Sequence, residues 1–226
     1  VETRKGYSLF GVADTTANAV LSAFTWSNSS GTELSLRFYN GTLQWYDVNV
    51  ATPLWETILT GLSTTKPIRW TTWWSATLSQ DLLLFVNNSA TLYEWSGATA
   101  SFDSAAATTI TKQGSATWRA SRFFNAGTRS VQIKDSGGTW REFAYTGGET
   151  TTTLTGVTPD PTGFTFNAGA RIVQSIRSNA NTPASGYTSD LISTLNNHIF
   201  VGSETSRLVY VSRQTDFTLF TFSTPR

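Results

Sequence analysis

The chain contains no cysteine, no methionine and a single histidine among its 226 residues. Without cysteine it can form no disulfide, and it offers no thiolate as a metal ligand or as a nucleophile. Because methionine is missing even at position 1, we expect a processed protein or a fragment of a longer one. His198 is followed by the apolar run Ile199-Phe200-Val201, so we interpret it as the start of a strand rather than as a metal ligand.

Charge is also scarce in this chain. Charged residues make up 14% of the sequence and the formal net charge is +1, whereas an average soluble domain has about 25% charged residues. This balance argues against a dedicated nucleic-acid binder. The carboxylates are scattered without metal-ligand spacing, so we expect neither a metal nor a cofactor. No apolar run approaches the roughly 20 residues of a membrane helix, so we expect no membrane contact.

Aromatic residues, by contrast, are abundant, at 13% of the chain with nine Trp and fourteen Phe. This composition favours β-strands and a packed core. Alternating or short apolar segments bounded by turn residues predict strands, and only residues 189–195 resemble a helical turn. The predicted strands cover residues 19–26, 33–39, 42–47, 53–59, 68–75, 82–86, 91–95, 116–124, 130–134, 139–145, 171–177, 198–202, 207–212 and 217–222.

These predicted strands recur with a period. Leu36 and Leu84 occupy corresponding places 48 residues apart, Leu43 and Leu92 lie 49 apart, and Leu84 and Val131 lie 47 apart. Repeats of this length with four short strands are typical of β-propeller blades. We therefore expect an all-β fold, a propeller of four-stranded antiparallel blades, with a β-sandwich as the alternative.

The repeat also predicts how the chain is divided. We expect an N-terminal arm or closing strand at residues 1–18, followed by one propeller domain at 19–226. Pro- and Thr-rich residues 146–167 predict a long surface loop inside the third blade. The expected blades are 19–66, 67–112, 113–168 and 169–226.

Two turns stand out by their chemistry. Asn40-Gly41 is a strong hairpin signal, because both residues tolerate a positive φ. In Asp135-Ser136-Gly137-Gly138-Thr139-Trp140, the Asp135 carboxylate can accept hydrogen bonds from the turn, Gly137 can take a positive φ, and Thr139-Trp140 can start the next strand. This Asp-x-Gly-x-Thr-Trp pattern resembles the Asp-box of sialidases and other β-propellers, although Ile133 stands where that pattern has Ser or Thr. The resemblance implies a structural corner.

One segment of the chain is locally basic. Between positions 112 and 141 there are six basic residues and one acid, Asp135, which predicts a surface that contacts phosphates or an acidic partner. The alternative is that these side chains are ordinary solvent-facing positions of strands. The candidate contact residues are Lys112, Arg119, Arg122, Arg129, Lys134 and Arg141.

A wider resemblance covers the C-terminal repeat. Residues 197–220, NHIFVGSETSRLVYVSRQTDFTLF, resemble a blade of the propeller proteins in the neck and tail of tailed bacteriophages, the tail-nozzle or packaged-DNA-stabilising hub class. The opening Thr3-Arg4-Lys5-Gly6-Tyr7 is similar to the Arg-x-Gly-aromatic start of the same proteins. Members of that class usually carry domains inserted in the propeller, and the sequence shows none.

The phage resemblance implies a structural, non-enzymatic virion component that forms a ring around the DNA channel. It would dock on a portal or adaptor or carry fibres. The implied partners are further copies of the chain and other virion proteins, with non-specific DNA contact as an addition. No residue is assigned a catalytic role.

Two alternatives remain open from the residues. A carbohydrate-binding or adhesive module, extracellular or on a cell surface, would bind a glycan with exposed aromatics such as Trp70, Trp73 and Trp74. A glycoside hydrolase of the sialidase type would need an arginine cluster around one pocket, for which Arg119, Arg122, Arg129, Arg171 and Arg177 are available.

Overall fold

The computed structural model describes residues 20–27, 33–48, 53–76, 78–113, 123–124, 129–179, 187–196 and 198–212. These residues form seventeen strands and one short 3₁₀ turn, η1 (Pro161–Gly163). All strand pairs are antiparallel, and several sheets have four strands, so the expected all-β antiparallel class is confirmed. The described sheets form no closed ring. In the part of the chain that the structure describes, no helix is long and apolar enough to cross a membrane.

The first sheet is a four-stranded meander made by consecutive strands. Its order is β1-β2-β3-β4. Asn40 (φ 45°) and Gly41 (φ 71°) form the hairpin turn between β2 and β3, as their sequence predicts. A side chain at position 41 would also lie 2.6 Å from the Leu62 carbonyl oxygen, so glycine is required there. The strands are β1 (Val20–Ser27), β2 (Glu33–Tyr39), β3 (Thr42–Asp47) and β4 (Leu54–Leu59).

The middle sheet has the same meander order, but its last strand comes from much later in the chain. It consists of β5 (Arg69–Ser75), β6 (Gln80–Val86), β7 (Leu92–Trp95) and β14 (Arg177–Asn179), in the order β14-β7-β6-β5. Glu94 of β7 pairs directly with Arg177 of β14. Residues 96–176 are therefore inserted between two hydrogen-bonded neighbours of one sheet.

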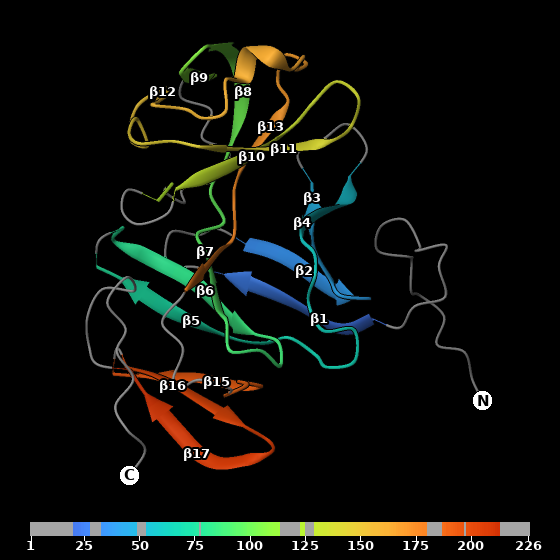
Figure 1. The fold of residues 1–226 in the computed structure, drawn as a ribbon, viewed down its shortest axis with the longest axis vertical. Helices are drawn as coiled ribbons and strands as arrows, with labels where there is room; N and C mark the ends of the chain where they lie inside the picture. The colour runs from blue at the N-terminus through green and yellow to red at the C-terminus, as the bar shows by residue number, and fades with distance from the viewer. Residues whose placement is uncertain are drawn as a thin grey trace, which may run out of the picture.

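This inserted unit, residues 96–176, has its own hydrophobic core and lies at one end of the molecule (Figure 1). Ile133, Phe143 and Ile172 are fully buried in that core. The expectation that the chain carries no inserted domain is thus wrong. The unit is a six-stranded sheet in the order β11-β10-β13-β8-β9-β12, made of β8 (Thr99–Ala106), β9 (Thr109–Lys112), β10 (Ser130–Lys134), β11 (Trp140–Ala144), β12 (Thr153–Thr155) and β13 (Arg171–Gln174).

The end sheet lies at the opposite end of the molecule and has three described strands. These are β15 (Leu191–Leu195), β16 (His198–Ser203) and β17 (Ser206–Val211), in sequence order. The helical turn expected at residues 189–195 is wrong, because Leu191 to Leu195 pair residue by residue with Gly202 to His198. Exposed and partly buried residues alternate along β15, which is the period of a strand.

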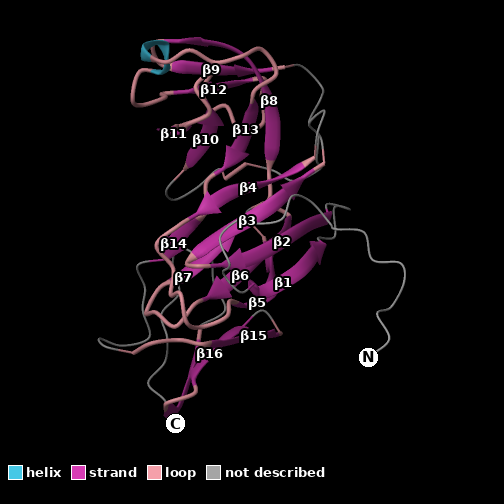
Figure 2. Cartoon of the chain, turned by 90° about the vertical axis from the view of Figure 1, so that its right-hand side faces the viewer, coloured by secondary structure: helices cyan, strands magenta, loops and turns pink. Residues whose placement is uncertain are grey.

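The first, middle and end sheets are stacked face to face through shared cores, and in Figure 2 the end sheet lies at the opposite end from the inserted unit with the first and middle sheets between them. Leu83 and Phe85 of β6 share a core with the first sheet, whereas Leu82, Leu84 and Val86 of the same strand share a core with the end sheet. The middle sheet therefore has both faces buried. This is why β6 reads as a continuous apolar run rather than as an alternating one.

The first strands of the three stacked sheets lie side by side. The backbone N–H of Ile68 donates to Ser22 Oγ over 3.0 Å, and Trp26 Nε1 donates to Thr72 Oγ1 over 3.3 Å, which joins β1 to β5. Thr71 Oγ1 and Thr194 Oγ1 are 3.0 Å apart, which joins β5 to β15. The three sheets thus repeat one arrangement rather than packing at random.

This division of the chain differs from the expected blades after residue 66. The first sheet falls within 19–66 as expected, but the sheet of the inserted unit takes strands from three of the expected blades. The strands predicted at 130–134 and 139–145 exist as β10 and β11, yet they belong to that larger sheet. The arm at 1–18 and the strand at 217–222 lie outside the described residues, and the strand at 116–124 lies mostly outside them.

Candidate interaction surface

An apolar face of the end sheet has no described sheet against it. Ile199 and Val201 point into the core shared with the middle sheet, so the alternate residues of the same strands point the other way. Leu191, Leu195 and Val209 are 44%, 63% and 53% exposed on that side. We call the side formed by Leu191, Leu195, Phe200, Gly202 and Val209 the open face.

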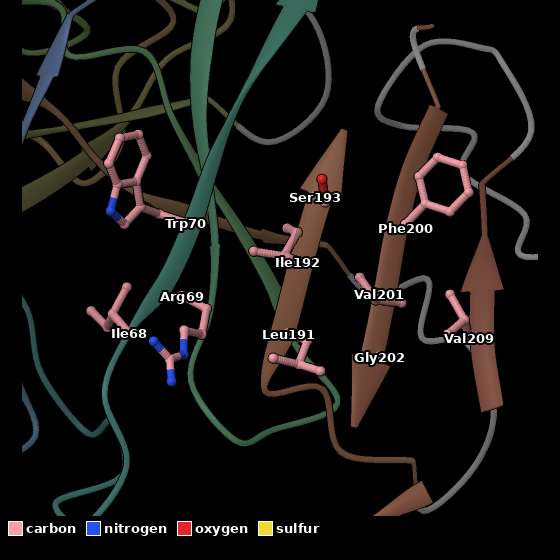
Figure 3. A pocket seen from close by; sticks show the side chains of 10 residues that line it. All are labelled: Ile68, Arg69, Trp70, Leu191, Ile192, Ser193, Phe200, Val201, Gly202 and Val209. Atoms are coloured by element: carbon pink, nitrogen blue, oxygen red, sulfur yellow. The ribbon is translucent and has the colours of Figure 1, made fainter. Parts of the chain in front are cut away.

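A groove of about 400 Å³ runs between the start of β5 and the end sheet (Figure 3). Figure 3 shows Ile192 directed toward β5 and Phe200 directed away from it. Ten residues line the groove, and Arg69 is the only charged one among them. Such a lining suits apolar contact and offers no group for acid–base chemistry.

Because Gly202 has no side chain, the surface of the open face is depressed at its centre. A Cβ at this position would lie 3.5 Å from Leu191 and 4.0 Å from Val209, which are ordinary contact distances. The sequence does not predict the open face, because it predicts a helical turn at residues 189–195. The apolar residues of that segment, Leu191, Ile192 and Leu195, have the spacing of a helix face, so the sequence gives no signal of a strand there.

The outer face of the first sheet is different in character. The Arg37 guanidinium lies 4.5 Å from the centre of the Trp55 ring and 5.3 Å from that of Tyr39, and its Nε donates to Gln44 Oε1 over 2.8 Å. The rings of Tyr46 and Trp55 are 5.1 Å apart. This face is therefore aromatic, and its cation, Arg37, already contacts two aromatic rings and the Gln44 side chain.

The structure does not bring the predicted basic residues together as an exposed strip. Lys112 is buried, and its Nζ lies 3.4 Å from the Glu149 carbonyl oxygen and 4.9 Å from the centre of the Phe123 ring. Burial lowers the pKa of Lys112. A buried lysine cannot contact DNA phosphates, so the prediction is wrong for this residue.

The other described basic residues have acidic partners. Arg129 lies 3.7 Å from Glu149, Lys134 bonds both carboxylate oxygens of Glu56 at 2.8 and 2.9 Å, and Arg141 bonds Asp135. Their positive charge is thus largely balanced inside the chain. Arg119 and Arg122 lie outside the described residues.

The Asp135 turn has the hydrogen bonds expected from its sequence, with one difference. The Asp135 carboxylate accepts the N–H groups of Gly137 and Thr139 over 3.0 and 2.8 Å, and Arg141 Nε donates to its other oxygen. These bonds lower the pKa of Asp135, and the bond from the Thr139 N–H contributes most. The positive φ of 86° falls on Gly138 and not on Gly137, which corrects that detail. Trp140 begins β11 and packs on the core between the first and middle sheets.

The aromatic residues that could bind sugar mostly join sheets instead. Trp73 is buried, and Trp70 stacks on Phe24 with ring centres 4.7 Å apart. Trp70 and Trp74 remain 37% and 41% exposed, and the described cavity beside Trp74 is one of about 90 Å³ with Thr72, Thr194 and Asn196, far smaller than the few hundred Å³ of an ordinary ligand pocket. The glycan alternative therefore gains no binding site from these residues.

The arginines proposed for a hydrolase pocket are spread over the molecule. Arg171 forms a bidentate pair with Asp47 at 2.8 and 2.9 Å, and Arg177 pairs with the buried Glu94. Arg129 lies elsewhere, beside Glu149. The Arg171–Asp47 pair fastens the inserted unit to the end of β3, so its role is structural.

No metal-binding cluster forms within the described ranges. They contain no group of three or more His, Asp or Glu side chains that could hold a metal ion. His198 Nδ1 lies 2.7 Å from the Ser212 carbonyl oxygen, which fits its interpretation as the start of a strand.

No family model matches the chain, and no curated protein or solved structure matches it either. Its function must therefore be argued from the stacked sheets and the open face.

Proposed function

We propose that this chain is a structural, non-enzymatic subunit of a particle of the tailed-bacteriophage type, a β-propeller protein of the neck or tail. In this proposal the first, middle and end sheets are consecutive propeller blades. The chain would then form part of a ring around the DNA channel, together with further copies or other virion proteins.

One observation carries the proposal. The middle sheet buries both faces between two antiparallel sheets, and β1, β5 and β15, the first strands of all three, lie side by side. Sheets repeated around an axis, with their first strands toward that axis, are the arrangement of a propeller. Propellers typically have about four to eight blades, so three stacked sheets require further sheets to close a ring.

The inserted unit supports the same proposal. The phage neck and tail propellers that the sequence resembles usually carry inserted domains. Here residues 96–176 enter between two paired strands of the middle sheet, with a separate hydrophobic core. An insertion of this kind leaves the stacking of the sheets intact and adds a surface outside it.

The test is whether this chain copurifies with tailed particles. Particles from the native source are separated on a density gradient, and each fraction is digested with trypsin and analysed by mass spectrometry for the peptide Leu208–Arg213. We expect the peptide to follow nuclease-protected DNA and tailed particles. Cryo-electron microscopy of those particles should then show repeated copies around the tail axis.

The peptide's presence in particle-free fractions alone would contradict the proposal. A capsid-protein peptide measured in the same fractions is the positive control. A peptide from a host ribosomal protein, which should stay out of the particle fractions, controls for contamination.

A further inference from the structure

We infer that the groove between β5 and the end sheet binds an aliphatic chain that carries one carboxylate, with the tail along the groove and the carboxylate at Arg69. Residues 68–70 of β5 form one wall of this groove, and residues 191–193 of β15 form the other. The inference goes beyond the proposed function, because a structural subunit needs no small ligand.

The groove has the size and the lining of a small-ligand site. Its volume of about 400 Å³ lies within the roughly 300–1,000 Å³ that is usual for such sites. Eight large apolar side chains are exposed among the described residues, and three of them, Trp70, Leu191 and Val209, line this one groove. Exposed apolar side chains gathered in this way mark a binding site, whereas scattered ones do not. An aliphatic tail would cover them.

The walls of the groove are held in place by the chain itself. The Trp70 ring stacks on that of Phe24 with ring centres 4.7 Å apart. Thr194 Oγ1 donates to the Thr72 carbonyl oxygen over 2.9 Å and lies 3.0 Å from Thr71 Oγ1, which fixes β15 against β5. A site with fixed walls loses little conformational freedom when a ligand binds.

Arg69 is the one charged residue of the lining, and Figure 3 shows its guanidinium on the β5 side of the groove. Glu204 interacts with its charge, but the Glu204 carboxylate is bonded to Lys66 Nζ over 2.9 Å. The buried Asp190 carboxylate accepts the backbone N–H of Glu204. Within the described ranges, no carboxylate forms an ion pair with Arg69. Its guanidinium is therefore available to a ligand carboxylate, for which its planar pair of N–H donors is well shaped.

The lining also argues against other classes of ligand. Ser193 has the only hydroxyl among the ten lining side chains, and no carboxylate or carboxamide lines the groove. A sugar would therefore leave most of its hydroxyl groups without partners. An aliphatic cation would be repelled by Arg69. An uncharged aliphatic chain would fit but would not use the arginine.

The experiment measures ligand binding to the purified full chain by isothermal titration calorimetry, below the concentrations at which the probes form micelles. Decanoate, decan-1-ol and decyltrimethylammonium have the same tail and differ in the head group. Octanoate and dodecanoate keep the carboxylate and change the length of the tail.

Two variants test the two parts of the site. Arg69→Gln removes the cation, and Ser193→Trp fills the groove from β15. Arg141→Gln removes an arginine from the inserted unit, and Thr108→Trp adds an indole ring to an exposed turn of that unit, so these two are the matched controls. Circular dichroism and thermal unfolding establish that each variant is folded.

We expect the wild type to bind decanoate about tenfold more tightly than decan-1-ol, because the alcohol lacks the charged partner of Arg69. Decyltrimethylammonium should bind most weakly. The affinity should rise about two- to fourfold per added methylene from octanoate to dodecanoate, as the buried tail lengthens. Arg69→Gln should bind the acid and the alcohol equally, Ser193→Trp should bind neither, and both controls should match the wild type.

Several results would overturn the inference. A wild type that does not bind decanoate would do so, as would decanoate binding that persists in Ser193→Trp, which indicates adsorption elsewhere on the surface. Equal binding of acid and alcohol by the wild type, or an unchanged preference for the acid in Arg69→Gln, would contradict the role of Arg69. None of these results bears on copurification with tailed particles, so failure of the inference is distinguishable from failure of the proposed function.

Discussion

Strands β6 and β16 have similar composition and opposite surroundings. Leu82 to Val86 of β6 are all fully buried, because a sheet lies against each side. In β16, Ile199 and Val201 are buried in the same way, but Phe200 between them belongs to the open face. Both strands have consecutive apolar residues, which is the pattern of a strand that packs against other layers on both faces.

The difference between these strands indicates where the described stack ends. Apolar residues on both faces of a strand are typical of a strand inside a layered structure. Among the residues that the structure describes, the end sheet has this pattern with cover on one face only. The open face therefore has the apolar side chains of a layer that packs against another one.

The largest expected effect comes from truncation inside β6. Phe85→Ala removes a fully buried ring that stacks on Tyr93 with ring centres 5.0 Å apart. We expect a loss of about 4 kcal/mol in the free energy of unfolding, measured by urea denaturation. Phe200→Ala on the open face is the matched control and should cost about 1 kcal/mol. Equal losses in the two variants would remove the distinction between the two strands.

The next effect tests how the inserted unit is held on the stack. Arg171→Met leaves the buried Asp47 carboxylate without its bidentate partner. Breaking a buried pair from one side should lower the free energy of unfolding by about 3 kcal/mol. The double variant with Asp47→Leu should recover much of this loss, since no buried charge remains. A double variant as unstable as Arg171→Met would contradict this explanation.

A smaller effect is expected at Lys112. Burial lowers its pKa in the folded state, so the wild type should gain stability as pH rises from that lowered pKa to the usual 10.5. Lys112→Met should lack this rise and stay within about 1 kcal/mol of the wild type at pH 7. Lys66→Met is the control, because the bond to Glu204 raises the pKa of Lys66 and gives the opposite pH trend. Unfolding curves from pH 7 to 11.5 measure both, because the Lys66 contribution is lost only above pH 10.5. A wild-type profile that stays flat up to pH 10.5 would contradict the prediction.

The smallest effect concerns the Asp135 turn. The N–H of Thr139 and the Arg141 guanidinium lower the pKa of Asp135 below its usual 3.8. The stability that this carboxylate adds is therefore present above that value and is lost as pH falls through the lowered pKa. Arg141→Gln should raise the pKa part of the way back, measured by NMR titration of the side-chain carboxyl carbon. An unchanged pKa would show that Arg141 adds nothing to the backbone bonds.

Local elements of this fold could be predicted well from the sequence. Residues 33–39, 42–47 and 130–134 are strands with the predicted bounds, and the Asn40-Gly41 hairpin has the predicted positive φ angles. These features depend on neighbouring residues alone, through alternation and turn chemistry. The strands β8, β9 and β12 were missed, since Thr-, Ser- and Ala-rich segments give little apolar signal.

Long-range pairing could not be predicted. Nothing near Arg177 indicates that its strand completes a sheet with Glu94, and the 47-residue offset to Val131 suggested a separate blade instead. The burial and the ion pairs of the basic residues could not be predicted for a related reason. Lys112 and Lys134 look exposed in the sequence, whereas their burial and their ion pairs depend on segments far along the chain, such as Glu56 and Glu149.

The insertion between β7 and β14 also sets an order in which the molecule can fold. Glu94 and Arg177 are 83 residues apart (177 − 94) yet directly paired. Closing so long a loop of unfolded chain is entropically costly and slow. Once the inserted unit has folded, Thr99 pairs with Val173 and the Gln174 N–H bonds the Ala98 carbonyl oxygen over 2.9 Å, so the two chain ends are already adjacent. Folding of the inserted unit therefore brings β7 and β14 together. We expect the amides of β8 and β13 to become protected from hydrogen exchange before those of β14 during refolding.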